Sequence, residues 1–221
     1  SWNKAIKSLH NPENLGNYKD NFYQRLAYDE IFSTFLVNSE IRKKIKKVKK
    51  IKKIFDNNKL DNVINNLDFT LTKDQLKTLT EINQDLCSEN KMFRLLQGDV
   101  GSGKTIVSLL AALNTINSGF QVAVMAPTEI LAMQHYDLAK KIFPKNLVIK
   151  LLSGKSELKI KKSIYKDLSE NKIDIIFGTH AIFQKKIVFK KLGLIIIDEQ
   201  HKFGVNQRKK LSDKGGDNCD V

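Results

Sequence analysis

A short glycine-rich segment, Gly98–Thr105, carries the clearest chemical signal in the sequence. It reads GDVGSGKT, which matches the pattern G-x-x-x-x-G-K-T, and it directly follows the apolar run FRLLQ at 93–97. Such glycines let the backbone turn so that its amides surround a polyphosphate, and a following helix presents its positive N-terminal end to the same anion. The segment therefore predicts a phosphate-binding loop. Its nucleotide-binding residues are Gly98, Gly101, Ser102, Gly103, Lys104 and Thr105.

The last two residues of this loop have separate chemical tasks. Lys104 supplies a positive point charge to the terminal phosphates, and the Thr105 hydroxyl supplies a hard oxygen for magnesium. A glycine turn that matches by chance is the alternative interpretation. The apolar run before the loop and the helical pattern after it are the context that a phosphate-binding loop requires, and they favour the motif.

An acidic pair, Asp198-Glu199, follows the apolar residues 194–197. The carboxyl end of a buried parallel strand is where such sheets place ligands. We expect Asp198 to hold magnesium through its water shell, and Glu199 to orient and deprotonate an attacking water. The predicted catalytic residues are therefore Lys104, Asp198 and Glu199. For His201 two interpretations stay open, a polar loop residue or a link between the nucleotide site and a neighbouring surface.

Short apolar runs alternate with amphipathic stretches after Leu71, which predicts the elements that position these residues. The runs lie at 93–97, 122–126, 147–152, 174–178 and 194–198, and helical patterns lie between them at 105–117, 129–142 and 157–169. Alternation of this kind is typical of an α/β fold in which helices cover both faces of a parallel sheet.

The first third of the chain differs, because it contains helical patterns and no catalytic signature. The net charge of +14 is concentrated there, since Arg42–Lys53 holds nine basic residues and no acidic one. Apolar residues recur in this region at spacings of three or four, so we expect a basic amphipathic helix. Both a solvated helix and a surface that follows phosphates fit this pattern.

Composition excludes some classes of protein. No apolar run approaches the roughly 20 residues that cross a bilayer, so we expect no membrane association. The first residues lack the apolar stretch of a secretion signal, and two distant cysteines, Cys87 and Cys219, form no disulfide or zinc framework. We therefore expect a cytoplasmic protein. Because the chain begins without methionine and ends abruptly at Val221, we also expect it to be a piece of a longer protein.

Four segments together resemble superfamily 2 helicases, and among them the RecG family of branched-DNA translocases. They are RLLQGDVGSGKT, VMAPTEILAMQH, GTHAIFQ and IIIDEQHKFGVNQR, and the earlier stretches AIKSLHNPEN and QRLAYDEIF are similar to the RecG segment that joins a DNA-wedge domain to the motor. The resemblance implies a RecA-like P-loop NTPase fold preceded by a helical segment. Residues 1–67 would be a helical connector with the basic amphipathic helix, and residues 68–221 the first motor domain.

The same resemblance implies further site residues. Phe69 and Gln75 correspond to an adenine-recognition element, and a glutamine amide can both donate to and accept from the adenine edge. Residues that would line the path of a nucleic-acid strand are Thr128, Glu129, Gly178, Thr179, His180 and Arg208. Helix capping is an equal and compatible interpretation of the two threonines. His201 and Gln207 would couple the sites, whereas Lys202 replaces an arginine of the family pattern and loses its two-pronged donor.

The resemblance implies an ATP-dependent DNA helicase that uses ATP and Mg²⁺ to remodel branched DNA such as forks and Holliday junctions. The second motor domain and the wedge domain would belong to the same parent chain. One alternative is a half-motor that binds nucleotide and DNA with negligible turnover, because arginine fingers from a second domain are worth about 10³ to 10⁵ in rate in related chemistry. The other is the motor of a transcription-repair coupling or primosomal helicase.

Overall fold

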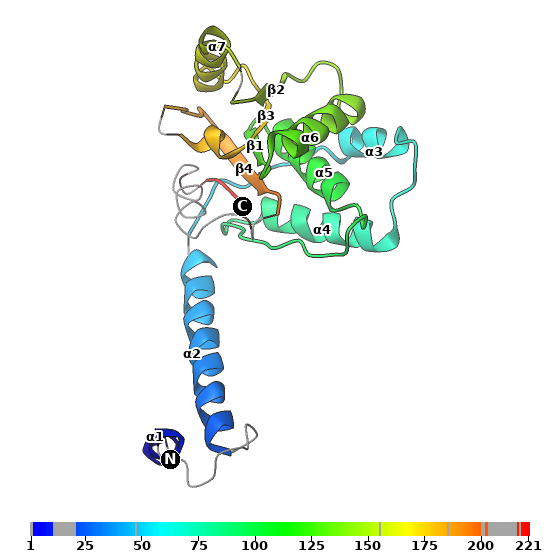
Figure 1. The fold of residues 1–221 in the computed structure, drawn as a ribbon. Helices are drawn as coiled ribbons and strands as arrows, with labels where there is room; N and C mark the ends of the chain where they lie inside the picture. The colour runs from blue at the N-terminus through cyan, green and yellow to red at the C-terminus, as the bar shows by residue number, and fades with distance from the viewer. Residues whose placement is uncertain are drawn as a thin grey trace. The chain divides into compact units, whose positions relative to one another are not determined.

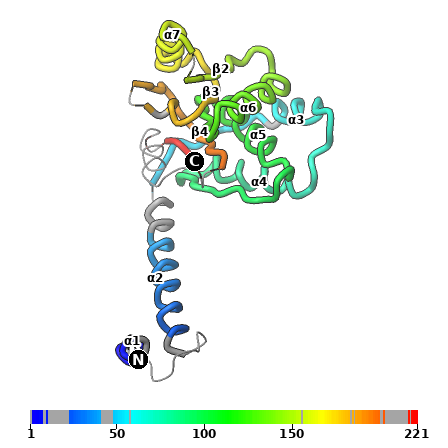
Figure 2. Tube along the Cα trace, in the orientation of Figure 1, coloured from blue at the N-terminus to red at the C-terminus, as the bar shows by residue number. Residues whose placement is uncertain are grey.

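The computed structural model divides the chain into two compact units, Ser1–Lys47 and Val48–Val221. It describes residues 2–10, 21–46, 48–154, 156–184, 186–199, 202, 216 and 218–221. Figure 1 shows the ribbon and Figure 2 the Cα trace in the same orientation. The second unit contains the predicted nucleotide-binding segments, and it begins well before residue 68, where the sequence places the start of the motor.

The first unit consists of two helices that contact each other, α1 (Trp2–His10) and α2 (Asn21–Lys46). Ala5 of α1 is buried. Along α2, the Arg25 guanidinium pairs with the Asp29 carboxylate one turn later at 3.0 Å. The apolar side chains Ile31, Phe35 and Leu36 of α2 are exposed in this structure. The helical patterns predicted for this region are therefore confirmed, although these three apolar side chains are not buried.

A four-stranded parallel sheet forms the centre of the second unit. The strands are β1 (Gln121–Met125), β2 (Ile149–Leu152), β3 (Ile175–Gly178) and β4 (Leu192–Ile197), in the spatial order β2-β3-β1-β4. The helices are α3 (Asn57–Asn65), α4 (Lys73–Cys87), α5 (Lys104–Asn117), α6 (Glu129–Ile142) and α7 (Leu158–Ser169), with the short 3-10 helix η1 (His180–Phe183). Because all strands run in one direction, their carboxyl ends meet at one edge.

Alternate residues along each strand point to opposite faces of the sheet, and each face has its own apolar core. One core contains Val122 and Val124 of β1 with residues from α3, α4, α5 and α6. The other contains Ala123 of β1 with residues of α7 and η1. Helix α5 is buried along almost its whole length, as expected for the central helix of such a layer. The predicted α/β architecture, with helices on both faces, is confirmed.

Local side-chain chemistry explains where two helices begin. The Thr72 hydroxyl accepts a hydrogen bond from the Gln75 amide, and the Gln75 side chain accepts from the Thr72 amide, which together form a capping box at the start of α4. At α6, the Thr128 hydroxyl accepts from the Leu131 amide at 3.3 Å. The capping interpretation of Thr128 is confirmed, and the predicted helix 129–142 matches α6 in full.

The apolar run 93–97 is a correction to the predicted strands, because residues 91–99 form no strand. Met92 and Arg94 exchange backbone hydrogen bonds with Val221, at 3.1 and 2.9 Å, and Asp220 forms a parallel bridge with Leu194 of β4. Residues 218–221 thus lie between β4 and the start of the run. Among the described residues, no strand lies beside residues 95–97. The run therefore has no neighbouring strand with which to form the hydrogen bonds of a sheet.

The predicted basic helix is also corrected. Helix α2 ends at Lys46, and residues 48–56 are not helical. Lys50 and Lys53 are buried, so these two lysines cannot follow phosphates on a surface. Residues 48–67 pack with the second unit instead, where Leu60 and Val63 of α3 join the core of α4 and α5. The spacing of apolar residues in this region therefore does not mark one continuous helix. It spans the non-helical residues 48–56 and the separate short helix α3.

Candidate active site

The phosphate-loop segment turns between residue 97 and the start of α5. Gly101 and Gly103 have φ values of 81° and 80°, a left-handed backbone that glycine adopts at little cost. A Cβ at Gly103 would also displace the flexible Gln75 side-chain amide, whereas the left-handed turn itself is what requires glycine. Helix α5 begins at Lys104 with no side-chain cap, which leaves its first backbone amides available to an anion.

The Lys104 ammonium lies back across the loop. Its Nζ atom donates to the carbonyl oxygens of Gly98 at 2.8 Å and Asp99 at 2.7 Å. The charge is thereby held within the turn, at the position from which it can reach a phosphate beside the loop amides. Thr105 follows it in the first turn of α5. The structure brings the predicted phosphate-binding residues together as one local unit.

Gln75 connects α4 to the loop. Its Oε1 atom accepts from the Thr72 amide at 2.9 Å, and its Nε2 atom donates to the Ser102 carbonyl at 2.9 Å. Both halves of the side-chain amide therefore have protein partners, and Phe69 is exposed just before α4. The structure places Gln75, one of the two predicted adenine-recognition residues, beside the phosphate loop, and it assigns Gln75 a positioning contact that the sequence does not reveal.

Asp198 is held at the carboxyl end of β4. Its backbone amide donates to the Met125 carbonyl at 2.8 Å, which ties the ends of β4 and β1 together. Its Oδ2 atom lies 2.8 Å from His135 Nε2. The hydrogen bond to His135 lowers the pKa of Asp198 most, and the Lys104 charge contributes in the same direction while partial burial opposes them. Asp198 and the phosphate-loop lysine therefore lie within electrostatic reach of each other.

His135 is the residue of this site that sequence reasoning missed. It comes from the buried side of α6 and is 9% exposed. A histidine within the apolar stripe of an amphipathic helix is the only signal in the sequence, and such a residue reads equally well as ordinary core. The side chain it contacts, that of Asp198, lies far along the chain, directly after β4.

Glu199 has an unusual backbone for its residue type, with φ at 47°. Left-handed conformations in residues other than glycine cost free energy and are concentrated at functional sites. Its Oε2 atom is buried without a directed hydrogen bond, although the Lys202 ammonium lies 2.6 Å away. We interpret this contact as an ion pair with poor hydrogen-bond geometry. The carboxylate is thus neutralised but keeps acceptor capacity for a water molecule.

The donor chemistry fits magnesium. The described residues contain no group of three or more His, Cys, Asp or Glu side chains that would enclose a metal. Mg²⁺ does not need such a cage, because it is usually held by one or two protein oxygens together with water and substrate phosphates. The Thr105 hydroxyl and the Asp198 carboxylate are hard oxygen donors, and the lowered pKa of Asp198 keeps its carboxylate ionised.

The predicted nucleic-acid residues lie at the ends of the neighbouring strands β1 and β3. The Ala126 amide donates to the Gly178 carbonyl at 3.0 Å, which joins the two strand ends. A Cβ at Gly178 would lie 2.6 Å from the Leu152 carbonyl, so glycine permits the close approach of β2. Thr179 makes no side-chain cap for η1, so its capping interpretation is wrong, and His180 is the first residue of η1.

Glu129 has a contact of its own. Its Oε1 atom accepts a hydrogen bond from the Gly154 amide at 2.6 Å. This contact ties the start of α6 to the turn after β2. Because a carboxylate repels phosphates, positioning of this turn explains the residue better than direct contact with a nucleic acid. His201, Gln207 and Arg208 lie outside the described residues.

A family model described as DEAD/DEAH box helicase matches residues 72–216. The chain belongs to this family. The match covers the phosphate loop, the acidic pair and the strand-end segments. A DEAD box protein from Methanococcus jannaschii has the same fold, with a TM-score of 0.57 and 21% identity over 77% of this chain and 49% of its own.

Within the family, the chain is similar to RecG helicases. It is 46% identical over 96% of its length to the ATP-dependent DNA helicase RecG of Aquifex aeolicus, and 41% identical over 99% to that of Streptococcus pneumoniae. It spans 27% and 32% of those two proteins. A solved structure of RecG bound to a three-way DNA junction matches with a TM-score of 0.76 and 44% identity, over 82% of this chain and 25% of that one.

No helix of the described residues is long and apolar enough to span a bilayer.

Proposed function

We propose that this chain is the first motor domain, with its preceding connector, of an ATP-dependent helicase that remodels branched DNA. The observation that carries the proposal is the assembly of the phosphate loop, Lys104 and the Asp198-Glu199 pair at one edge of a parallel sheet. Similarity to RecG, including RecG bound to a three-way junction, supports branched DNA as the substrate. It also favours RecG over the transcription-repair coupling and primosomal helicases.

The residues have distinct tasks in this proposal. The loop amides and Lys104 bind the phosphates of ATP, while Thr105 and Asp198 hold Mg²⁺, which would neutralise charge on the terminal phosphates. Glu199 accepts a proton from the attacking water, and its ion pair with Lys202 positions the carboxylate. His135 fixes the orientation of the Asp198 carboxylate. Phe69 and Gln75 recognise the adenine, for which Gln75 would exchange one of its present partners.

Nucleic acid is proposed to lie along the edge formed by the ends of β1 and β3. Thr128, Gly178, Thr179 and His180 would face its backbone, and Glu129 would position the turn at Gly154. Arg208 would add a phosphate contact, while His201 and Gln207 would couple DNA to nucleotide. A second motor domain and a wedge domain in the parent chain would complete the cycle, and we propose a cytoplasmic location for the parent protein.

One experiment separates the active motor from a half-motor that only binds. ATP hydrolysis is measured with the full-length parent protein, with and without a three-way junction, for the wild type and for Glu199→Gln. We expect junction-stimulated turnover in the wild type, and in Glu199→Gln a loss of roughly a hundredfold or more with ATP binding retained, because the base is lost and the shape is kept. Equal turnover in the two proteins would remove Glu199 from the mechanism. A full-length wild type that hydrolyses ATP, beside this chain binding ATP without hydrolysing it, would support the half-motor that only binds.

A further inference from the structure

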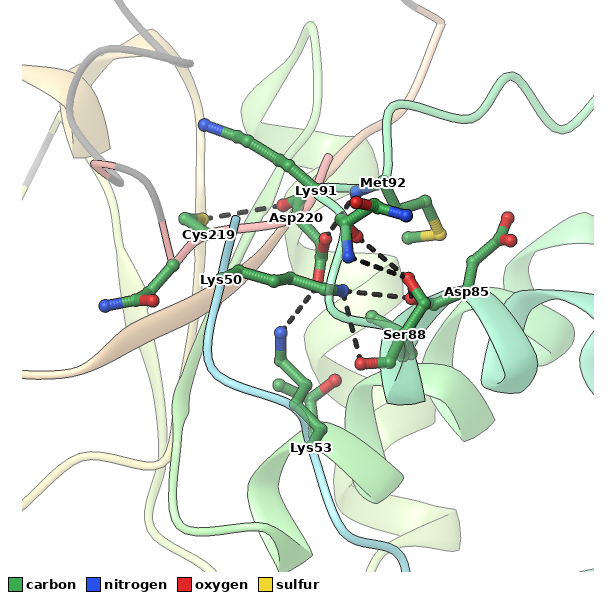
Figure 3. Close-up of polar contacts among 12 residues, drawn as sticks. Lys50, Lys53, Asp85, Ser88, Lys91, Met92, Cys219 and Asp220 are labelled. Carbon is green, nitrogen blue, oxygen red and sulfur yellow. Dashed lines mark hydrogen bonds and ion pairs between the residues drawn. The ribbon is translucent and has the colours of Figure 1, made fainter. Parts of the chain in front are cut away.

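A buried ionic cluster lies apart from the phosphate-binding residues. It consists of Lys50, Lys53 and Asp220, whose side chains are all 0% exposed. Asp220 Oδ2 pairs with the Lys50 ammonium at 2.6 Å and with the Lys53 ammonium at 2.5 Å, while Asp220 Oδ1 accepts from the Met92 amide at 2.7 Å. Figure 3 shows the two lysine side chains, from one short segment, converging on Asp220 from the end of the chain. We call these three residues the Asp220 cluster.

The cluster also holds the end of α4. The Lys50 ammonium donates to the carbonyls of Asp85 at 3.0 Å and Leu86 at 3.2 Å, in the last turn of that helix (Figure 3). With its bond to Asp220, all three ammonium protons have acceptors. Two ammonium groups on one carboxylate leave an excess positive charge, and the negative end of the α4 dipole compensates for it. Burial lowers the pKa of Lys50, and the Asp220 carboxylate opposes this effect.

Backbone hydrogen bonds join the same segments around the cluster. The Lys50 amide donates to the Glu89 carbonyl at 2.8 Å, and the Lys91 amide donates to the Val48 carbonyl at 3.0 Å. On the other side, the Ile195 amide of β4 donates to the Asp220 carbonyl at 2.9 Å. Residues 48–53, the end of α4, Met92 and β4 therefore meet at this point.

Two routes lead from the cluster to the phosphate loop. One runs along α4 from Leu86 to Gln75, whose side-chain amide donates to the Ser102 carbonyl at 2.9 Å. The other runs along the chain from Met92 through residues 93–97 to Gly98. The loop is thus positioned at both of its ends by elements that the cluster holds. Both lysine ammonium groups are committed to Asp220, so their effect on the nucleotide site would pass through these elements.

We propose that the Asp220 cluster is a positioning device for the nucleotide site, which fixes the phosphate loop through α4 and through Met92. The inference rests on the proposed function, because it assumes that the loop binds ATP. Buried ion pairs are often neutral for stability compared with apolar replacements, so their presence calls for another role. Residues 48–53 directly follow the first unit in sequence. A conformational change in residues 48–53 would therefore alter the position of the phosphate loop through the Asp220 cluster.

The test compares nucleotide affinity with thermal stability in matched variants. Asp220→Asn removes the charge and keeps the shape, and Lys53→Met removes one ammonium. Lys52→Met is the control within the same segment, because Lys52 is exposed and pairs with Glu89 on the surface. Leu168→Ala is the control for destabilisation alone, because Leu168 of α7 is buried in the other core. Binding of a fluorescent ATP analogue with Mg²⁺ is measured well below the melting temperature of each protein.

We expect Asp220→Asn and Lys53→Met to weaken binding by about three- to thirtyfold, the range typical of coupling within a contacting network. Lys52→Met and Leu168→Ala should bind like the wild type, although Leu168→Ala melts earlier. Unchanged affinity in both cluster variants, with Lys104→Ala defective, would overturn this inference and leave the proposed function intact. A wild type that binds no better than Lys104→Ala would overturn both.

A measurement on the wild type guards against cluster variants that fail to fold. Because coupling between two sites is reciprocal, bound nucleotide must stabilise the cluster in return. We expect the ATP analogue to slow amide hydrogen exchange at residues 85–92 in the wild type and to leave it unchanged in Lys104→Ala. Amide exchange at residues 85–92 that the nucleotide leaves unchanged, while exchange in the phosphate loop slows, would contradict the proposal.

Discussion

Asp198 shows how single residues at this site depend on partners far away in sequence. Its carboxylate follows β4, but its orientation and its lowered pKa come mainly from His135 on α6. Outer-shell partners of this kind orient a ligand before the metal arrives, and they contribute to metal affinity without touching the ion. The orientation and the pKa of Asp198 therefore depend on both β4 and α6. The Asp198-Glu199 motif reveals only the contribution of β4.

Replacement of His135 tests this dependence. In His135→Ala, we expect the pKa of Asp198 to move back toward its ordinary range and its side chain to lose its fixed orientation. The Mg²⁺ concentration needed for half-maximal binding of an ATP analogue should rise about tenfold or more, as for other outer-shell substitutions. His135→Asn, which retains a donor, should recover part of the loss. An unchanged Mg²⁺ requirement in a folded His135→Ala protein would show that the histidine is ordinary core.

Sequence reasoning predicted the candidate site residues whose signal is local. The glycine loop and the Asp198-Glu199 pair are short patterns whose neighbouring residues predict a strand or helix boundary. The contact of Gln75 with Ser102, the contact of Glu129 with Gly154 and the bond between His135 and Asp198 had no such signal. Each joins residues that only the packed fold brings together.

At the scale of elements, residues 218–221 are decisive for the region around the phosphate loop. They bridge to β4 on one side and to Met92 and Arg94 on the other. Cys219 lies within this segment and is fully buried, and burial raises the pKa of its thiol to about 12. Cys87, at the end of α4, is partly exposed.

Thiol labelling reports on this docked segment. At pH 8 we expect iodoacetamide to modify Cys87 in the native chain and to leave Cys219 unmodified, because the nucleophile is the thiolate and Cys219 is both buried and protonated. Both thiols should react in denaturant, which provides the control. Mass spectrometry of the digested protein distinguishes the two sites. If Cys219 in the native chain is labelled as fast as Cys87, residues 218–221 are not held against β4.

Helices and most strands were predictable because their periodicity is local. The predicted segments 105–117, 129–142 and 157–169 correspond to α5, α6 and α7, within a residue at each end. The apolar run 93–97 failed as a strand, because strand formation needs a neighbouring chain that no periodicity can reveal. The basic helix failed at Lys46, because burial of Lys50 and Lys53 depends on Asp220, at the other end of the chain.

At the scale of the whole molecule, the chain divides into two units, and only the second has a sheet and a predicted catalytic site. The sequence places the boundary of the motor at residue 68, and the family match begins at residue 72. The compact unit begins earlier, at Val48, because residues 48–67 pack against α4 and α5. The start of the motor at residue 68 therefore stays a prediction. A fragment designed to fold alone should begin no later than residue 48.

The most direct test of the account is Mg²⁺-dependent binding of ATP to this chain, compared between the wild type and Lys104→Ala. The hydrogen bonds of the Lys104 ammonium to the described residues go to two loop carbonyls, so its charge serves the ligand and not the core. We expect the wild type to bind ATP in the presence of Mg²⁺, and Lys104→Ala to lose about tenfold or more in affinity with its melting temperature nearly unchanged. Equal affinity in the two proteins, or a large fall in melting temperature without nucleotide, would contradict the assignment of this loop as the site that binds ATP.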